Sequence, residues 1–350
     1  MPRVLGIDAG TVSIDLCGLD GGRVWLDQTL PTREALENPR DFLGLLESQG
    51  EIALIAGPSG YGLPLVRADR VSESDLRLAF LAPPGETGGI GGLRRLAELL
   101  RDSGLPLLYT PGVMHLPTVP LHRKLNRVDL GTADKVAAAA LGIWDQARRV
   151  GEPERTAFIL LELGGAFTAA LAIDRGAIVD GVGGSSGPMG WRSSGAWDGE
   201  VAFLAGAVDK DSLFHGGRVD APRAEESADP GLAAYIEGAV KAVLALTAAL
   251  PEPREILLSG RQALDPAVRP GLEARLRRVA PVRDLEGFAR VAKQGAQGAA
   301  LIADGLTGGP AATLVDTLRL REAAGSVLDH LRVISPATAK RTLGLGADER

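Results

Sequence analysis

At the start of the chain, apolar and polar positions alternate in the manner of extended strands. Residues 4–8 are mainly apolar and end on Asp8, and turn residues follow at positions 9–11. The alternation resumes over residues 13–18, and the Asp-Gly-Gly sequence at positions 20–22 is typical of a hairpin turn. The pattern predicts a three-stranded meander at the start of the fold.

The same pattern recurs in the middle of the chain. An apolar run ends on Glu162, a glycine turn follows, and two more strand-like runs meet at a second hairpin turn. The interval from Glu162 to Asp174 equals the interval from Asp8 to Asp20. This match indicates an internal duplication. Chance similarity between two strand-turn-strand patterns is the alternative.

Between and after the meanders, helical periods alternate with short buried strands, which is typical of an α/β fold. The helix expected over residues 132–149 is rich in alanine, and the helix expected over 295–305 is rich in small residues. We expect one more helix and a polar tail after residue 310. Further helices are expected at residues 39–49, 90–102 and 229–250, and further strands at 52–56, 105–109 and 255–258.

The length of 350 residues is sufficient for two domains that each bury a core. The two meanders therefore suggest how the chain divides. We expect an N-terminal half at residues 1–150, a C-terminal half at 151–308, and a C-terminal helix and tail at 309–350.

Composition and charge limit the possible partners. A net charge of −6 argues against nucleic acid as the main partner, although a small anion can still bind through local donors. The single Cys17 excludes, within one chain, a disulfide framework, a cysteine-based zinc site and an iron–sulfur cluster. No apolar stretch has the length of a signal peptide or membrane span, so we expect no membrane association and a cytoplasmic location.

The turn after Asp8 is the first candidate for chemistry. A tight turn at Gly10 and Thr11 would present backbone N–H groups and a hydroxyl to an anion. Asp8, at the end of a buried strand, would hold Mg²⁺ through water. The alternative is an ordinary turn with a surface aspartate.

The corresponding turn in the second meander contains Gly164 and Gly165, with Glu162 before them and the hydroxyl of Thr168 after them. By the same reasoning it could bind the terminal phosphate, with Glu162 as a second metal ligand, although alone it could be a simple hairpin. Gly260 and Arg261 follow a buried strand, where an adenosine could lie against the backbone. A strand-to-helix turn is the alternative there.

The order of these segments resembles the acetate-and-sugar-kinase, heat-shock-chaperone and actin superfamily. More narrowly, most of the chain resembles a prokaryotic family described as predicted butyrate kinases. The stretches that carry this resemblance are residues 6–11, 56–64 and 127–135. The resemblance implies a duplicated ribonuclease-H-like (actin-like ATPase) fold, with two similar α/β halves around a nucleotide cleft. It also implies ATP and Mg²⁺ as cofactors and a small-molecule acceptor.

Two local similarities concern the acceptor. Residues 189–195 are similar to a stretch of acetate kinases whose arginine stabilises the transferring phosphoryl group, and Arg192 would take this role. A loop residue among glycines is the alternative. The segment that begins at His115 resembles an acetate-kinase segment, with one extra residue, and makes His115 a candidate for substrate binding. The aspartate that precedes this segment in acetate kinases has no match here.

Asp134 is a candidate replacement for that aspartate, because residues 131–135 resemble a segment of type III pantothenate kinases in which an aspartate acts on the acceptor hydroxyl. A favourable position in the first turn of a helix is the alternative explanation for this acid. Arg123 and Arg127 lie in the densest basic run, which could bind an acidic acceptor or be a solvated loop.

The leading hypothesis is an ATP-dependent kinase of a short carboxylate, which needs no general base because it is already an anion. A kinase of a hydroxyl acceptor and a regulatory ATPase of the same fold are the alternatives. The phosphate-binding loop of P-loop enzymes is absent from the sequence. Neither a monomer nor a homodimer is excluded.

Overall fold

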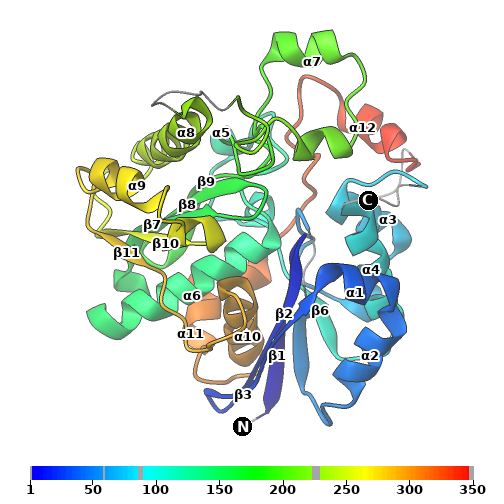
Figure 1. The fold of residues 1–350 in the computed structure, drawn as a ribbon. Coiled ribbons are helices and arrows are strands. Elements are labelled where there is room, and N and C mark those ends of the chain that lie inside the picture. The colour runs from blue at the N-terminus through cyan, green and yellow to red at the C-terminus, as the bar shows by residue number, and fades with distance from the viewer. Residues whose placement is uncertain (1, 58–59, 86–89, 223–228, 347–350) are drawn as a thin grey trace.

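The computed structural model describes residues 2–57, 60–85, 90–222 and 229–346; Pro58 and Ser59, in a stretch that carries the resemblance, lie outside this part. The described residues form two mixed β-sheets flanked by helices (Figure 1). In spatial order, the first sheet contains β3 (Arg23–Pro31), β2 (Ser13–Asp20), β1 (Arg3–Ala9), β4 (Leu54–Gly57), β6 (Leu107–Tyr109) and β5 (Val66–Arg67). The second contains β9 (Ala177–Val182), β8 (Thr168–Asp174), β7 (Ala157–Leu163), β10 (Glu255–Ser259) and β11 (Val282–Asp284).

The two sheets repeat the same arrangement. β1, β2 and β3 form an antiparallel meander, as do β7, β8 and β9, and both predicted meanders are confirmed. In each sheet the first strand also pairs in parallel with a later strand, β4 or β10, which pairs in parallel with β6 or β11. Even the irregularities correspond, because the register shifts between Gly18 and Leu19 and between Ala172 and Ile173. The sheets therefore have the topology of two duplicated halves.

The longer helices lie close to where the sequence predicts them. The helix at residue 230 begins as expected, with Asp229 accepting a hydrogen bond from the Leu232 N–H group and Pro230 in the first turn. The twelve α-helices of the described residues are α1 (Thr32–Glu37), α2 (Pro39–Glu47), α3 (Glu73–Phe80), α4 (Ile90–Asp102), α5 (Leu121–Lys124), α6 (Ala133–Val150), α7 (Gly199–Ala205), α8 (Pro230–Leu246), α9 (Arg269–Leu276), α10 (Gln294–Leu306), α11 (Ala312–Thr317) and α12 (Pro336–Thr342).

Helices α6 and α10 lie between the two sheets (Figure 1). Helix α10 packs on β1, β2 and β4 of the first sheet and against α6. The crossing is close because a Cβ atom at Gly298 would lie 1.7 Å from the carbonyl oxygen of Ala137. The expected boundaries at residues 150 and 308 stay predictions, since α10 comes from the expected second half and covers the first sheet.

The hydrophobic core follows this layering. One cluster joins the first sheet to α2, α3 and α4, and another joins the second sheet to α8 and α9. The third and largest cluster surrounds α6 and α10 and includes residues of both sheets. The apolar faces of both sheets are therefore buried on both sides, apart from their edges. None of the described helices combines the length and the apolar character needed to cross a membrane.

The C-terminal segment differs from the expectation of one helix and a polar tail. It contains two α-helices, α11 and α12, and buries Leu328, Leu343 and Leu345 in the central cluster. In this segment of the sequence, the apolar residues are separated by polar ones without a clear helical periodicity. The segment is ordered by packing rather than by its own helix propensity; residues 347–350 lie outside the described part.

Candidate active site

Two glycine turns occupy corresponding places in the two sheets. The first glycine loop, residues 9–12, connects β1 to β2, and the second, residues 164–167, connects β7 to β8. Gly10 N–H donates to the Ser13 carbonyl at 2.9 Å, and Gly164 N–H donates to the Phe167 carbonyl at 3.0 Å. The two loops thus form the same type of hydrogen-bonded turn. The other N–H groups of such a turn can donate to an anion.

The second glycine loop approaches both the first loop and the segment after β10. A Cβ atom at Gly165 would lie 3.6 Å from a methyl carbon of Val12 and 3.6 Å from Cδ of Arg261. Gly260 has a φ of +86°, and its Cα comes so close to the loop that a Cβ would lie 2.4 Å from the Leu163 carbonyl oxygen. The residues that the sequence suggested for nucleotide binding, except Thr168, are brought together.

Arg192 links the two loops. Its Nη2 donates to the Thr11 hydroxyl at 3.3 Å. Its own backbone is fixed to the second loop, because the N–H groups of Arg192 and Ser193 both donate to the Ala166 carbonyl at 3.1 Å. Its Nε is buried and has no hydrogen-bond partner within the described part of the chain. The guanidinium group therefore keeps a free donor at the point where the loops meet.

Three carboxylates and a lysine lie beside these loops. Asp8 is near the end of β1, Glu162 near the end of β7, and Asp134 in the first turn of α6. The ammonium group of Lys135 is 2.5 Å from Asp134 Oδ2 and 2.5 Å from Glu162 Oε1. Lys135 thus connects the start of α6 to the second sheet. Lys135 belongs to the stretch 127–135 that carries the resemblance, but the sequence alone did not indicate that it is part of the site.

The charges of this group shift its pKa values in different directions. Burial, followed by the negative charge of Asp134, raises the pKa of Asp8 to about 7. Burial also raises the pKa of Glu162, against the opposing effect of Lys135. Burial acts in the same direction on Asp134, but the charge of Lys135 and hydrogen bonds from Lys135 and Thr132 prevail and lower its pKa. Asp134 is therefore held as an anion, whereas Asp8 is not.

Asp8 also lies against the start of α10. A Cβ atom at Gly295, the second residue of α10, would lie 2.5 Å from Asp8 Oδ2, so any larger residue there would displace this carboxylate. Lys293, just before α10, donates to the Ser13 hydroxyl and lies 3.3 Å from Asp15 Oδ2. Its charge lowers the pKa of Asp8, against burial. Lys293 is a second site residue that the sequence did not predict. The only feature that could have indicated it is its position directly before a helix rich in glycine and alanine.

Two cavities open beside this group. The large cavity has a volume of about 760 Å³, and Thr11 and Arg192 form part of its wall, with α1, α4 and the turn at Asp211–Phe214 around them. The small cavity has a volume of about 50 Å³ and lies between α4 and the start of α6. The residues that line the small cavity are Ala9, Gly60, Phe80, Leu93, Leu96, Ala97, Leu100 and Asp134.

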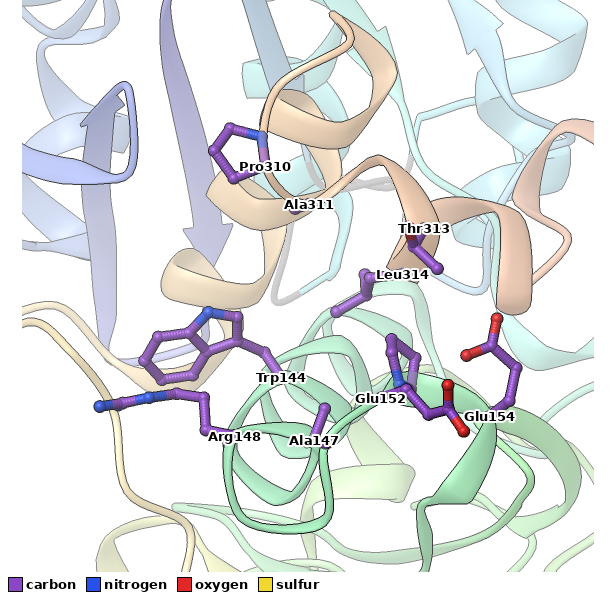
Figure 2. Close-up of a pocket in the computed structure, with 11 residues that line it drawn as sticks. Trp144, Ala147, Arg148, Glu152, Glu154, Pro310, Ala311, Thr313 and Leu314 are labelled. Atoms are coloured by element: carbon purple, nitrogen blue, oxygen red, sulfur yellow. The ribbon is translucent and has the colours of Figure 1, made fainter.

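A third hollow, of about 750 Å³, lies elsewhere. Figure 2 shows it between the C-terminal part of α6, with Trp144 and Arg148, and the α11 region, with Pro310 and Leu314. Asp134 is at the opposite end of α6, about 20 Å from Arg148 along the helix axis. This hollow therefore does not belong to the candidate active site.

Four predicted site residues are not brought to the glycine loops, and these assignments are corrected. Thr168 is fully buried on β8 and faces Tyr235 of α8. It lies on the opposite face of the strand because side chains alternate there. His115 is only 4% exposed, and burial lowers its pKa to about 4, so it is a core histidine.

The two arginines expected to bind the acceptor lie near β9 instead. Arg123 donates to the Val179 carbonyl at 2.7 Å and is 3.5 Å from Asp180 Oδ2. Arg127 is exposed. The basic run therefore ties α5 to the second sheet, and it does not line either cavity beside the loops.

The two matched sheets, with their glycine loops facing each other, define a duplicated actin-like ATPase fold. The structure is similar to a propionate kinase from Francisella tularensis, with a TM-score of 0.59 and 12% identity over 85% of this chain and 99% of that one. It is also similar to an acetate kinase from Entamoeba histolytica, with a TM-score of 0.56 and 12% identity over 79% of this chain and 86% of that one.

The acetate kinase of Porphyromonas gingivalis gives a TM-score of 0.55 and 14% identity over 80% of this chain and 88% of that one. At such identities the likeness to these three structures shows the fold and no more. The chain belongs to the family described as "Protein of unknown function (DUF1464)", whose sequence profile matches residues 6–333. Comparison with curated proteins gives no significant match.

Proposed function

We propose that the protein is an ATP-dependent phosphotransferase that acts on a small carboxylate. The observation that carries this proposal is the meeting of the two glycine loops at Arg192, beside Asp8, Asp134 and Glu162. Phosphoryl transfer depends mainly on positioning and on positive charge around the moving group. The described residues supply both requirements at one point between the two sheets.

The nucleotide would lie between the two glycine loops. Backbone N–H groups near Gly10 and Gly164 would donate to the phosphates, and the nucleoside would lie against Gly260 and Arg261. Lys293 would add positive charge beside the first loop. Helix α10 packs closely on β1, since a Cβ atom at Gly6 would lie 2.2 Å from the Ala296 carbonyl oxygen, and this packing would support the first loop.

A divalent cation fits the donor set at Asp8. Among the described residues Asp8 forms no ion pair, and burial, followed by the charge of Asp134, raises its pKa; a cation beside it would offset both effects. No group of three or more potential metal ligands is found in the described residues, so Asp8 and Glu162 would hold Mg²⁺ together with water and phosphate oxygens. Mg²⁺ would neutralise charge on the phosphates.

Arg192 would stabilise the phosphoryl group during transfer. A planar guanidinium can donate to two equatorial oxygens at once. In the proposed reaction, an oxygen of the acceptor carboxylate forms a bond to the γ-phosphorus while the bond to the bridging oxygen of ADP breaks. ADP leaves with the electron pair, an acyl phosphate forms, and no proton is transferred.

The state of Asp134 favours a carboxylate over a hydroxyl acceptor. Lys135 and Thr132 lower its pKa, which makes it a weak base at neutral pH. An alcohol must lose its proton during transfer, whereas a carboxylate has none to lose. A hydroxyl acceptor stays the second candidate, because Asp134 lies at the wall of the small cavity, where it could accept a hydrogen bond from such a group.

The experiment is an ATP-consumption screen with short carboxylates, pantothenate-like compounds and sugars, and with a control that lacks acceptor. Phosphorylation of a carboxylate supports the proposal. The variant Asp134→Asn separates the two acceptor classes: the KM of a carboxylate should change with kcat nearly kept, and kcat for a hydroxyl acceptor should be lost. ATP hydrolysis that no acceptor stimulates would instead support a regulatory ATPase.

A further inference from the structure

We propose that Lys293 binds a phosphate group of the nucleotide and that Asp27, on the edge strand β3, is the positioning residue that holds Lys293 there. The inference rests on nucleotide binding at the first glycine loop, as proposed above, and adds the residues that would fix the phosphates. A Cβ atom at Gly10 would lie 3.6 Å from Nζ of Lys293, so the ammonium group is beside this loop. The Lys293 side chain is 44% exposed, and a ligand can therefore reach it from solvent.

Two side chains of β2 direct the Lys293 ammonium group. Its Nζ donates to the Ser13 hydroxyl and lies 3.3 Å from Oδ2 of Asp15, whose side chain is only 1% exposed. Asp15 Oδ1 also accepts a hydrogen bond from the backbone N–H of Lys293 at 3.3 Å. An ammonium group has three N–H donors, so within the described residues one of them is left for a phosphate oxygen.

The place of Lys293 also offsets the negative charge around the first loop. Asp8 and Asp15 are directly opposite each other where β1 pairs with β2, so their side chains lie on the same face of the sheet, the face that α10 covers. Two carboxylates beside a phosphate site would repel an anionic ligand. Lys293 contacts Asp15 and its charge acts on Asp8, so it reduces this repulsion.

Asp27 holds the segment that leads to Lys293. Residues 285–293 form neither helix nor strand. From β3, the Asp27 carboxylate accepts hydrogen bonds from the three consecutive backbone N–H groups of residues 290–292, at distances between 2.7 and 3.1 Å. Burial opposes the charged form of Asp27, but these hydrogen bonds prevail and lower its pKa. The carboxylate therefore fixes the backbone directly before Lys293.

Gln297 of α10 secures the same segment from the other side. Its Oε1 accepts hydrogen bonds from the N–H groups of Phe288, at 2.7 Å, and Ala289, at 3.0 Å. Its Nε2 donates to the Ala292 carbonyl at 2.7 Å. The backbone before Lys293 is thus held between the edge strand and α10. If Asp27 served only to stabilise this segment, its loss would not affect phosphate binding selectively.

The test measures nucleotide binding to the full chain by calorimetry, with ADP as the probe and with adenosine measured by its displacement of ADP. Lys293→Gln keeps a polar group for Asp15 but removes the charge, and it should raise the Kd for ADP roughly tenfold or more. The Kd for adenosine should stay within about twofold, because adenosine has no phosphate.

Asp27→Ala should cause the same selective loss of ADP binding as Lys293→Gln. Because Asp27 acts through Lys293, the double variant should bind ADP no more weakly than Lys293→Gln alone. Asp20→Ala, at the exposed far end of β2, is the matched control and should bind both probes as the unmodified protein does. In steady-state kinetics, Asp27→Ala and Lys293→Gln should raise the KM for ATP and leave kcat within a few-fold.

Thermal melting checks that each variant is folded. Asp27→Asn keeps one acceptor oxygen and should show a smaller loss of ADP binding; it replaces Asp27→Ala if that variant does not fold. An unchanged Kd for ADP in either single variant, an equal loss for adenosine, or losses that add in the double variant would each overturn the inference. Selective loss of ADP binding in a protein that phosphorylates no acceptor would keep the inference and overturn the proposed function.

Discussion

The two glycine loops have the same backbone turn but different electrostatic surroundings. Beside the second loop, Glu162 of β7 is paired with Lys135 at 2.5 Å. Beside the first, Asp8 of β1 has no ion-pair partner within the described residues, and burial and the charge of Asp134 raise its pKa to about 7. Duplication explains the common turn, and the difference in charge indicates that the loops have different tasks.

The difference suggests how the tasks are divided. An unpaired, partly buried carboxylate is costly in a folded protein unless a ligand compensates it, so on the proposed function Asp8 would be the position that meets a cation. Glu162 is already compensated, and its contact with Lys135 fixes the start of α6 to the second sheet. Arg192 extends from beside the second loop to Thr11 of the first, so the proposed transfer would need both halves.

The largest effect is expected from removing the link between the loops. Arg192→Ala should lower kcat by about two to four orders of magnitude and leave the KM for ATP nearly unchanged. Arg192→Lys should recover little, since a point charge cannot hold two oxygens in one plane. Steady-state kinetics with the acceptor found by the screen measures both.

Arg261→Ala is the matched control, because Arg261 lies against Gly165 of the second loop. It should raise the KM for ATP and leave kcat within a few-fold. Full activity of Arg192→Ala would show that its similarity to the acetate-kinase segment is accidental.

The next effect compares the two carboxylates directly. Asp8→Asn should lower kcat by about two to three orders of magnitude with little change in nucleotide affinity, because a metal contact matters most as charge develops during transfer. Glu162→Gln should lower kcat less and should reduce stability, since Lys135 loses a partner. Kinetics and calorimetry with ATP distinguish the two; equal losses of kcat would contradict the division of tasks.

Lys135→Met removes the compensating charge of the second loop. Asp134 and Glu162 would lose their shared ion-pair partner, and we expect the free energy of unfolding to fall by about 3–5 kcal/mol in the absence of ligands. Denaturant unfolding measures this loss. Lys135→Arg keeps the charge and is the control, and an unchanged midpoint for Lys135→Met would show that the ion pairs do not stabilise the fold.

A smaller effect should distinguish Asp8 by pH. The folded chain keeps the Asp8 proton up to about pH 7, whereas the unfolded chain loses it near about pH 4. Stability from this residue is therefore fully present below about pH 4 and decreases as the pH rises to about 7. Asp8→Asn should remove this decrease in melting curves recorded across that range, and an unaltered pH dependence would argue against an unpaired Asp8.

The smallest effect is expected at Thr168, because its side chain is buried against Tyr235 of α8. Thr168→Val keeps the approximate shape of this fully buried side chain but removes its hydroxyl, and it should change kcat and the KM for ATP by no more than about twofold. A large increase in the KM for ATP would restore Thr168 to the nucleotide site and overturn its assignment to the core.

Much of the fold was determined by local patterns in the sequence. The alternation around Asp8 and Glu162 determined both meanders, and the capping signal at Asp229 determined the start of α8. These features depend on neighbouring residues and on turns, which a sequence shows directly. The same patterns located the glycine loops, because the residues that form a tight turn are consecutive.

Tertiary structure alone decided which side chains share the site. Lys135 reaches Glu162 only because α6 packs beside the second sheet, and Lys293 reaches Ser13 only because α10 covers the first. In contrast, Thr168 lies on the buried face of its strand and His115 is buried in the core, so neither side chain reaches the site. The small cavity depends on how α4 packs against the start of α6. Such contacts join residues far apart in the chain. Their geometry is set by tertiary packing, which the local pattern of apolar and polar residues does not predict.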